Sequence, residues 1–256
     1  MLVHAPDVGQ EQTGRGMVTL GIDLAAQPAD TGVCAVSWAE RVTIELASAS
    51  ADDTLLTKLI TKADRVGVDV PLGWPMPFVR AVADYQNQLS WAGGHGEEMQ
   101  LRKTDQWLRN ALQMRPLSVS ADKIGVPAMR AAHLLSSLDP PLDRSGRGKV
   151  VEVYPAAALK CWGFPYRGYK RNAGRAIREQ LLQSFVERTR RWIELTQDVH
   201  AACTESDHVF DALIAALVAR AAHLGLVHPI AEDDIKTAQM EGWIALPLED
   251  SLDRLA

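Results

Sequence analysis

Four acidic residues stand where a protein core does not ordinarily hold them. Asp23 ends the apolar run TLGID, Asp69 ends the run VGVD, and Glu152 follows the run KVV. The fourth, Asp211, lies in SDHVFDALIAALVARAA, one helical turn after Asp207. An ionised carboxylate buried without a partner is costly. We therefore expect these residues to pair with a base, to accept backbone hydrogen bonds or to bind a cation.

Convergence of these carboxylates would favour a divalent metal site. Carboxylates that meet at one sheet edge repel one another unless a cation neutralises them. A helix that packs its apolar face on the sheet could direct Asp211 at the strand ends and supply the last ligand. Two divalent ions held about 3.5–4 Å apart can activate a water molecule and stabilise the leaving oxygen of a phosphodiester. We therefore expect Mg²⁺ or Mn²⁺ as the cofactor.

Each of these residues also has an ordinary structural interpretation. An Asp that ends a strand before a turn is common, so Asp23 or Asp69 alone could be structural. Asp207 could be the N-cap of its helix rather than a metal ligand. Glu152 could form a buried ion pair with a Lys or Arg, and His208 could be a partly exposed helix residue. The set taken together nevertheless favours a shared polar site.

Basic and polar residues elsewhere could bind a substrate. Arg167, Lys170 and Arg171 are interleaved with Tyr166 and Tyr169, a pattern suited to phosphate contact and base stacking, although a solvated basic helix face is the alternative. Further candidates for lining a groove lie in RKTDQWL and SVSADKIG, with a polar helix face as the alternative: Arg102, Asp105 and Lys123.

The elements that must position these residues follow from the apolar pattern. Strands are predicted in MVTLGIDLA, TGVCAVSW and RVTIELASAS, then a helix near 52–60, then a strand in DRVGVDVP. This β-β-β-α-β order predicts an α/β fold with an RNase H-like mixed sheet, in which three antiparallel strands are followed by parallel strands. Helices are expected to flank that sheet.

The remaining chain is expected to complete a single domain at 17–256. Residues 76–148 predict a helical insertion that shapes a substrate surface. Beyond it we expect a buried strand in KVVEVYP, amphipathic helices at 173–196 and 207–224, and a short strand or extended docking segment in EGWIALP. Residues 1–16 lack the apolar core of a signal peptide and predict a flexible extension.

Composition limits the classes of protein. The 256 residues are 47% hydrophobic and 23% charged, which is typical of a globular protein. A net charge of −5 argues against a surface coated in positive charge, so nucleic-acid contact would need a local basic patch. Three distant cysteines without zinc-ligand spacing, and no long apolar run, favour a cytoplasmic protein outside the membrane.

Several motifs of the sequence resemble those of a known family. GIDLA, VGVDVPLGWP, VEVYPAA and DHVFDALIAA are similar to motifs of the uncharacterised family called domain of unknown function 429, which is described as a predicted nuclease with an RNase H fold. The resemblance covers about residues 17–247. More distantly, the acids resemble those of RuvC-like resolvases. That resemblance implies Asp23, Asp69 and Asp211 as metal ligands, completed by His208 or Asp207.

The resulting hypothesis is a metal-dependent nuclease. Its catalytic set would be Asp23, Asp69 and Asp211, assisted by Glu152 and His208, and its substrate would be DNA or RNA, with branched forms included. A non-catalytic binding module on the same fold is the first alternative. An actin- or sugar-kinase-like ATP-binding phosphotransferase is the second, although the chain lacks the glycine-rich phosphate hairpins of that class. The oligomeric state stays open, a dimer among the alternatives.

Overall fold

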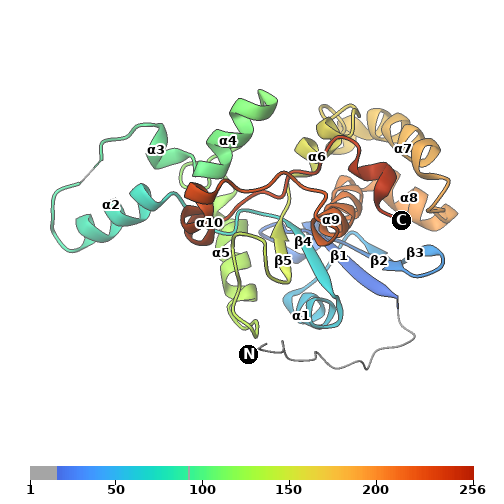
Figure 1. Cartoon of the computed structure of the whole chain (residues 1–256), viewed down its shortest axis with the longest axis horizontal. Coiled ribbons are helices and arrows are strands. Elements are labelled where there is room, and N and C mark those ends of the chain that lie inside the picture. Colours follow the sequence, from blue (N-terminus) through green and yellow to red (C-terminus); the bar gives the residue numbers. More distant parts are fainter. Residues whose placement is uncertain (1–15, 92) are drawn as a thin grey trace, which may run out of the picture.

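A five-stranded mixed sheet organises the structure, a computed structural model that describes residues 16–91 and 93–256. The strands lie in the order β3-β2-β1-β4-β5 (Figure 1). The sequence-based expectation of a mixed α/β fold is confirmed. The predicted N-terminal extension lies outside the described residues, apart from Gly16. The strand bounds are β1 Met17–Asp23, β2 Gly32–Trp38, β3 Val42–Ser48, β4 Arg65–Asp69 and β5 Val150–Glu152.

β1 separates the antiparallel part of the sheet from the parallel part. β1, β2 and β3 pair antiparallel, whereas β4 lies parallel to β1 and β5 lies parallel to β4. The parallel pair carries the same three-residue pattern, because GID of β1 lies beside GVD of β4 in register. Gly21 pairs with Gly67, and Asp23 pairs with Asp69. The two acids therefore end neighbouring strands at the same sheet edge.

Helices cover both faces of the sheet, as Figure 1 shows. Alternate residues of β1, such as Leu20 and Ile22, pack in one buried cluster with α1 and α5. The opposite face packs against α9, whose apolar residues join a second cluster with α7. Because side chains alternate along a strand, Gly21 and Asp23 face α9. The helices of these layers are α1 Asp53–Lys62, α5 Gly125–Leu135, α7 Arg175–Thr189, α8 Gln197–Glu205 and α9 Asp207–His223.

The stretch at 76–148, expected to be largely helical, contains four helices. Two of them, α2 and α3, extend away from the sheet (left in Figure 1). The helices of this stretch are α2 Met76–Gln86, α3 Glu97–Gln100, α4 Lys103–Leu112 and α5. Two further helices follow later in the chain, α6 Pro155–Cys161 and α10 Ile235–Glu241.

Two C-terminal expectations needed correction or refinement. The helix predicted at 173–196 ends earlier, at Thr189, and Ile193 then makes an isolated bridge with Val42 of β3. The EGWIALP segment is extended: Ile244 bridges to Glu152, and the Ala245 amide donates to the Glu152 carbonyl at 2.8 Å. This segment therefore docks along the free edge of β5.

Glycines allow α9 to lie directly against the strands. A β-carbon on Gly21 would collide with the α9 backbone at Ala212 and Ala216, and one on Gly67 would collide at Ala215. Gly32 of β2 is likewise covered by the backbone of His208. Real side chains cannot occupy such positions, so these glycines set how near the acids of α9 come to the strand ends.

Two further features concern the whole described chain. Within residues 16–91 and 93–256, no helix has the length and apolar character needed to cross a membrane. The three cysteines are buried and free.

The close packing of α9 can be tested with Gly21→Ala. The added methyl group must displace the helix backbone, so we expect a loss of about 1–3 kcal/mol in the free energy of unfolding, measured by urea denaturation. Gly148→Ala is the control, because its new β-carbon would meet its nearest neighbour, Asp143 Cβ, at an ordinary 3.4 Å. Equal stability of the two variants would contradict the proposed role of Gly21.

Candidate functional site

A cavity of about 450 Å³ opens at the sheet edge where β1 and β4 end. It is lined by Asp23 and Asp69 and by residues of the 76–148 insertion, which include Leu117 and Lys123. The segment after β5 adds a further wall that includes Tyr154 and Lys170, and Tyr166 lines it as well. The cavity thus brings together residues from five separate parts of the sequence.

Asp23 is paired with His208 of α9. The His208 Nδ1 and Asp23 Oδ2 atoms lie 2.7 Å apart, and the Asp23 side chain is only 14% exposed. This hydrogen bond raises the pKa of His208, against the lowering effect of burial, and the Asp23 charge raises it further. His208 is thus a partly exposed helix residue, as the structural alternative expected, and it also has a defined carboxylate partner.

Asp211 is fully buried and has two partners in the GYK segment. The Tyr169 hydroxyl donates to Asp211 Oδ1 at 2.8 Å, and Lys170 Nζ lies 2.6 Å from Asp211 Oδ2. Burial raises the pKa of Asp211, and the Lys170 charge opposes that rise. The basic segment predicted to contact a phosphate thus reaches the acidic site itself through Lys170.

The three aspartates lie within electrostatic reach of one another. Burial raises the pKa of Asp69 well above its usual range; the Lys170 charge opposes this, while the charges of Asp23 and Asp211 add to it. No such interaction would arise if the three acids were dispersed. The register of β1 and β4 and the packing of α9 thus bring Asp23, Asp69 and Asp211 together at one sheet edge.

Lys170 supplies positive charge to this group. Burial by itself lowers the pKa of the Lys170 ammonium, but Asp211, Asp69 and Asp23 together raise it well above its usual value. The side chain is 47% exposed, so the ammonium group also borders solvent. Lys170 is the cation that balances the acids in the structure.

Glu152 belongs to a separate ion-pair network. It pairs in register with Val68, so its side chain leaves the sheet on the face opposite Asp69. Arg102 Nη1 and Nη2 donate to the two Glu152 oxygens at 2.7 and 2.6 Å, and the Leu72 amide donates at 2.9 Å. Glu152 is thus a buried ion-pair partner, which was the structural alternative for this residue.

Arg102 links this network to the insertion. Its Nε and Nη2 atoms donate to the Asp105 carboxylate at 3.0 and 2.9 Å, and Nη1 donates to the Glu241 carbonyl at 3.3 Å. Glu241 in turn accepts from the Met76 and Lys103 amides. Arg102 and Asp105 line the cavity, but their charged groups are already paired. They hold α4, α10 and β5 together.

The other predicted residues lie around the rim. Ser206, not Asp207, is the N-cap of α9, because its hydroxyl accepts from the Val209 amide. Asp207 and Arg171 line a second hollow beside His208, and Lys123 borders both hollows. Arg167 packs over the Tyr166 ring, 5.1 Å from its centre, and does not line either hollow.

Some cavity residues carry no pattern that identifies them in the sequence. Leu117 comes from an irregular segment between α4 and α5. Tyr154 stands in VEVYP, two residues after Glu152, where alternation would place it on the face of Glu152 if the strand continued. The hydrogen bond from Tyr169 to Asp211 likewise depends on the tertiary fold.

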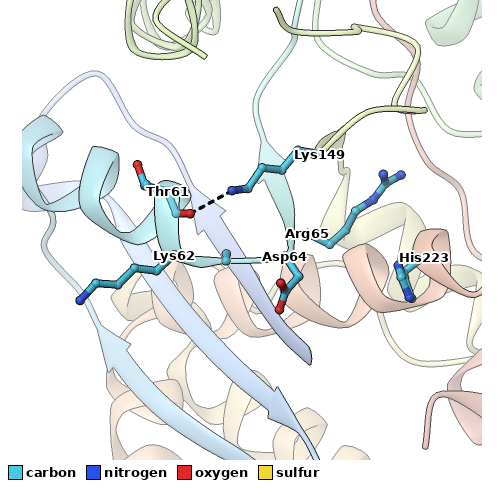
Figure 2. A pocket seen from close by; sticks show the side chains of 7 residues that line it. Thr61, Lys62, Asp64, Arg65, Lys149 and His223 are labelled. Carbon is cyan, nitrogen blue, oxygen red and sulfur yellow. Dashed lines mark hydrogen bonds between the residues drawn. The ribbon is translucent and has the colours of Figure 1, made fainter. Parts of the chain in front are cut away.

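A basic depression at the opposite end of β4 contrasts with this site. Figure 2 shows Lys62, Asp64, Arg65, Lys149 and His223 around it. Polar side chains around it form hydrogen bonds with backbone groups. Asp64 accepts from the Val18 amide at 2.7 Å, and Lys149 donates to the Thr61 carbonyl at 3.1 Å. Arg65 donates to carbonyls of the loop before β5. These contacts join strands and loops at the far sheet edge.

The donor set at the strand ends fits a hard divalent cation in chemical type. Mg²⁺ and Mn²⁺ prefer carboxylate oxygens, which Asp23, Asp69 and Asp211 provide. In the described part of the chain, no three His, Cys, Asp or Glu side chains already stand in a metal-binding arrangement. Lys170 forms an ion pair with Asp211 and so supplies positive charge beside the acids, and His208 is hydrogen-bonded to Asp23.

The raised pKa of the buried Asp69 carboxyl predicts a pH-dependent effect of Asp69→Asn. Because the folded protein raises the pKa of Asp69, it binds this proton more tightly than the unfolded chain does. Above the ordinary Asp pKa of about 3.9, the free energy of unfolding therefore falls as pH rises toward the raised pKa. The variant avoids this loss, so its stability advantage should be absent at strongly acidic pH and grow toward neutrality in metal-free urea titrations.

Asp253→Asn provides a comparison of opposite sign. A hydrogen bond from Arg188 lowers the pKa of Asp253, so its charged form stabilises the folded state above the ordinary pKa. This exposed site should give a small loss of stability toward neutral pH. An Asp69→Asn protein less stable than the wild type at neutral pH would contradict the raised pKa described for Asp69.

The comparisons with known proteins give a family without an assigned activity. The family model described as "Protein of unknown function (DUF429)" matches residues 21–235, which include Asp23, Asp69, Glu152 and Asp211. No curated protein and no solved structure matches the chain. The resemblance noted from the motifs is thereby confirmed at the level of the family. The chain belongs to the DUF429 family.

Proposed function

We propose that this protein is a metal-dependent phosphodiester hydrolase with an RNase H-like fold. The observation that carries the proposal is the register pair of Asp23 and Asp69 at the ends of parallel strands, with Asp211 of α9 in electrostatic reach. The sheet order supports the fold assignment, because three antiparallel strands precede two parallel ones as in that fold. Nucleic acid is the proposed substrate.

Asp23, Asp69 and Asp211 would hold Mg²⁺ or Mn²⁺. When bound, the metal ions supply activation of a water molecule and stabilisation of the leaving oxygen. The chain's own cations attract the substrate: Lys170 and Lys123 border the cavity and present positive charge to an anionic phosphodiester. Repulsion among the acids is the energetic reason for them to accept a cation.

His208 is placed to handle a proton. Its Nδ1 faces Asp23 at 2.7 Å, so Nε2 is the ring nitrogen left for exchange with a substrate or water. The side chain is 36% exposed, which keeps it within reach of solvent. His208 would hold a proton at Nε2 for the leaving oxygen, while Asp23 orients its ring.

One observation favours the non-catalytic binding module as a second candidate. Asp23, Asp211 and Glu152 each already have a partner within the chain: His208, Lys170 and Arg102 respectively. In such a module these pairs would be permanent and the cavity would recognise a partner. The two candidates differ in their response to metal, because an ion that binds only the folded state must raise the melting temperature.

Asp23→Asn tests the hydrolase directly. Loss of a contact behind a metal ligand commonly costs about 10–100-fold in activity, so loss of a ligand should cost about 100-fold or more. Cleavage would be measured on single-stranded, duplex and branched DNA and RNA with Mg²⁺ or Mn²⁺. Asp30→Asn, which changes an exposed acid beyond the end of the same strand, should leave cleavage unchanged.

Two results would refute the hydrolase proposal. One is an Asp23→Asn protein that cleaves as well as the wild type. The other is a wild-type protein that cleaves none of these substrates and whose melting temperature does not respond to Mg²⁺ or Mn²⁺. The second result would favour the binding module.

A further inference from the structure

We propose that the cavity receives a single unpaired nucleotide, with its base against the apolar wall and its phosphate toward the aspartates and Lys170. Where it concerns cleavage, this inference rests on the proposed hydrolase function. It adds the class of substrate: an unpaired nucleotide unit, either free or within a single strand, rather than a closed duplex.

The cavity lining combines two kinds of residue. Asp23, Asp69, Lys123 and Lys170 are charged, and the paired Arg102, Asp105 and Glu152 line it as well. The apolar lining comes from the insertion and from the segments after β5 and α10: Pro116, Leu117, Ile124, Pro127, Tyr154 and Ile244. A phosphate alone would use only the charged residues. A ligand that uses both must carry an anionic group and a flat or apolar group together, as a nucleotide does.

Leu117 is an exposed apolar side chain in the cavity wall that a bound apolar group could cover. It lines the cavity, yet it is 46% exposed and belongs to none of the three buried hydrophobic clusters of the described chain. Exposed leucines are common, but this one lines a cavity that Tyr154 and Tyr166 also line. A base placed there would cover the Leu117 side chain.

Aromatic residues supply a surface on which a base can stack. Tyr154 and Tyr166 are both half-buried and both border the cavity. Stacking on an aromatic ring tolerates any base, because every base has a π-face. Lys160 Nζ lies 4.9 Å and Arg167 Cζ 5.1 Å from the Tyr166 ring centre. These cations already lie over the Tyr166 ring, so Tyr154 is the proposed stacking surface.

The size of the cavity is compatible with one nucleotide. Its volume of about 450 Å³ lies within the range of about 300–1,000 Å³ for pockets that enclose single small ligands. A base inside a duplex is stacked and paired, so it reaches such a pocket only when it is unpaired or turned out of the helix. The walls are held by the buried Arg102–Glu152 pair, which ties the insertion to β5.

A binding experiment separates the base from the phosphate without needing catalysis. AMP and ribose 5-phosphate share the sugar and phosphate and differ by the base. Calorimetric titration of the wild type should give an affinity for AMP about 10-fold or more above that for ribose 5-phosphate. Leu117→Asn should remove most of this preference. Leu224→Asn, a leucine outside the cavity that is similarly exposed at 40%, should preserve it.

A cleavage experiment distinguishes a nucleotide within a single strand from a free nucleotide. With Mg²⁺ or Mn²⁺, the wild type should cleave a 12-nucleotide single strand at least about 10-fold faster than the matching blunt duplex, and Leu117→Asn should lose most of that selectivity. AMP preference without cleavage of any strand would refute the hydrolase and support a free nucleotide as the ligand. Equal affinity for AMP and ribose 5-phosphate, or equal cleavage of strand and duplex, would overturn the inference.

Discussion

Helix α9 lies so close to β1 and β4 that no side chain fits between them, and the functional geometry depends on that contact. Gly21 and Gly67 leave room for the helix backbone, and the alanines of α9 face them. Because Asp23 and Asp69 each stand two residues after one of these glycines, they share its face of the sheet. Asp211 comes one residue before the first alanine that Gly21 contacts. Strand register therefore brings Asp23 and Asp69 together, and the packing of α9 on the same face brings Asp211 to that edge.

The resulting concentration of negative charge explains the arrangement of the basic residues. Lys170 forms an ion pair with Asp211, whose charge raises the pKa of Lys170, and His208 is paired with Asp23. Arg102 instead neutralises Glu152 and Asp105 on the other face of the sheet, where it is fully enclosed. In the first group, the side chains of Lys170 and His208 are partly exposed. The second is sealed, so its contribution is to hold the cavity walls in place.

The local pattern predicted the strands, the helix at 207–224 and the acids at the strand ends, because alternation and apolar runs are local properties. The structure then shows that Asp23 and Asp69 each share the sheet face of the glycine two residues before them, because side chains alternate along a strand. The separation of Glu152 from the aspartates needed the register of β5 with β4. The partners Arg102, Tyr169 and Lys170 depend on long-range packing, and so does the apolar wall at Leu117. Family membership adds no chemistry, because the family has no assigned function.

The most direct test of the central claim is anomalous diffraction from crystals of the wild-type protein grown with Mn²⁺. The account predicts an anomalous peak in contact with carboxylate oxygens of Asp23 and Asp69, and an Asp211 carboxylate released from Lys170. Crystals of Asp69→Asn grown in the same way should lose the peak. Saturating Mn²⁺ with no peak at the strand ends, and with Lys170 still paired to Asp211, would contradict the claim that these aspartates form a metal site.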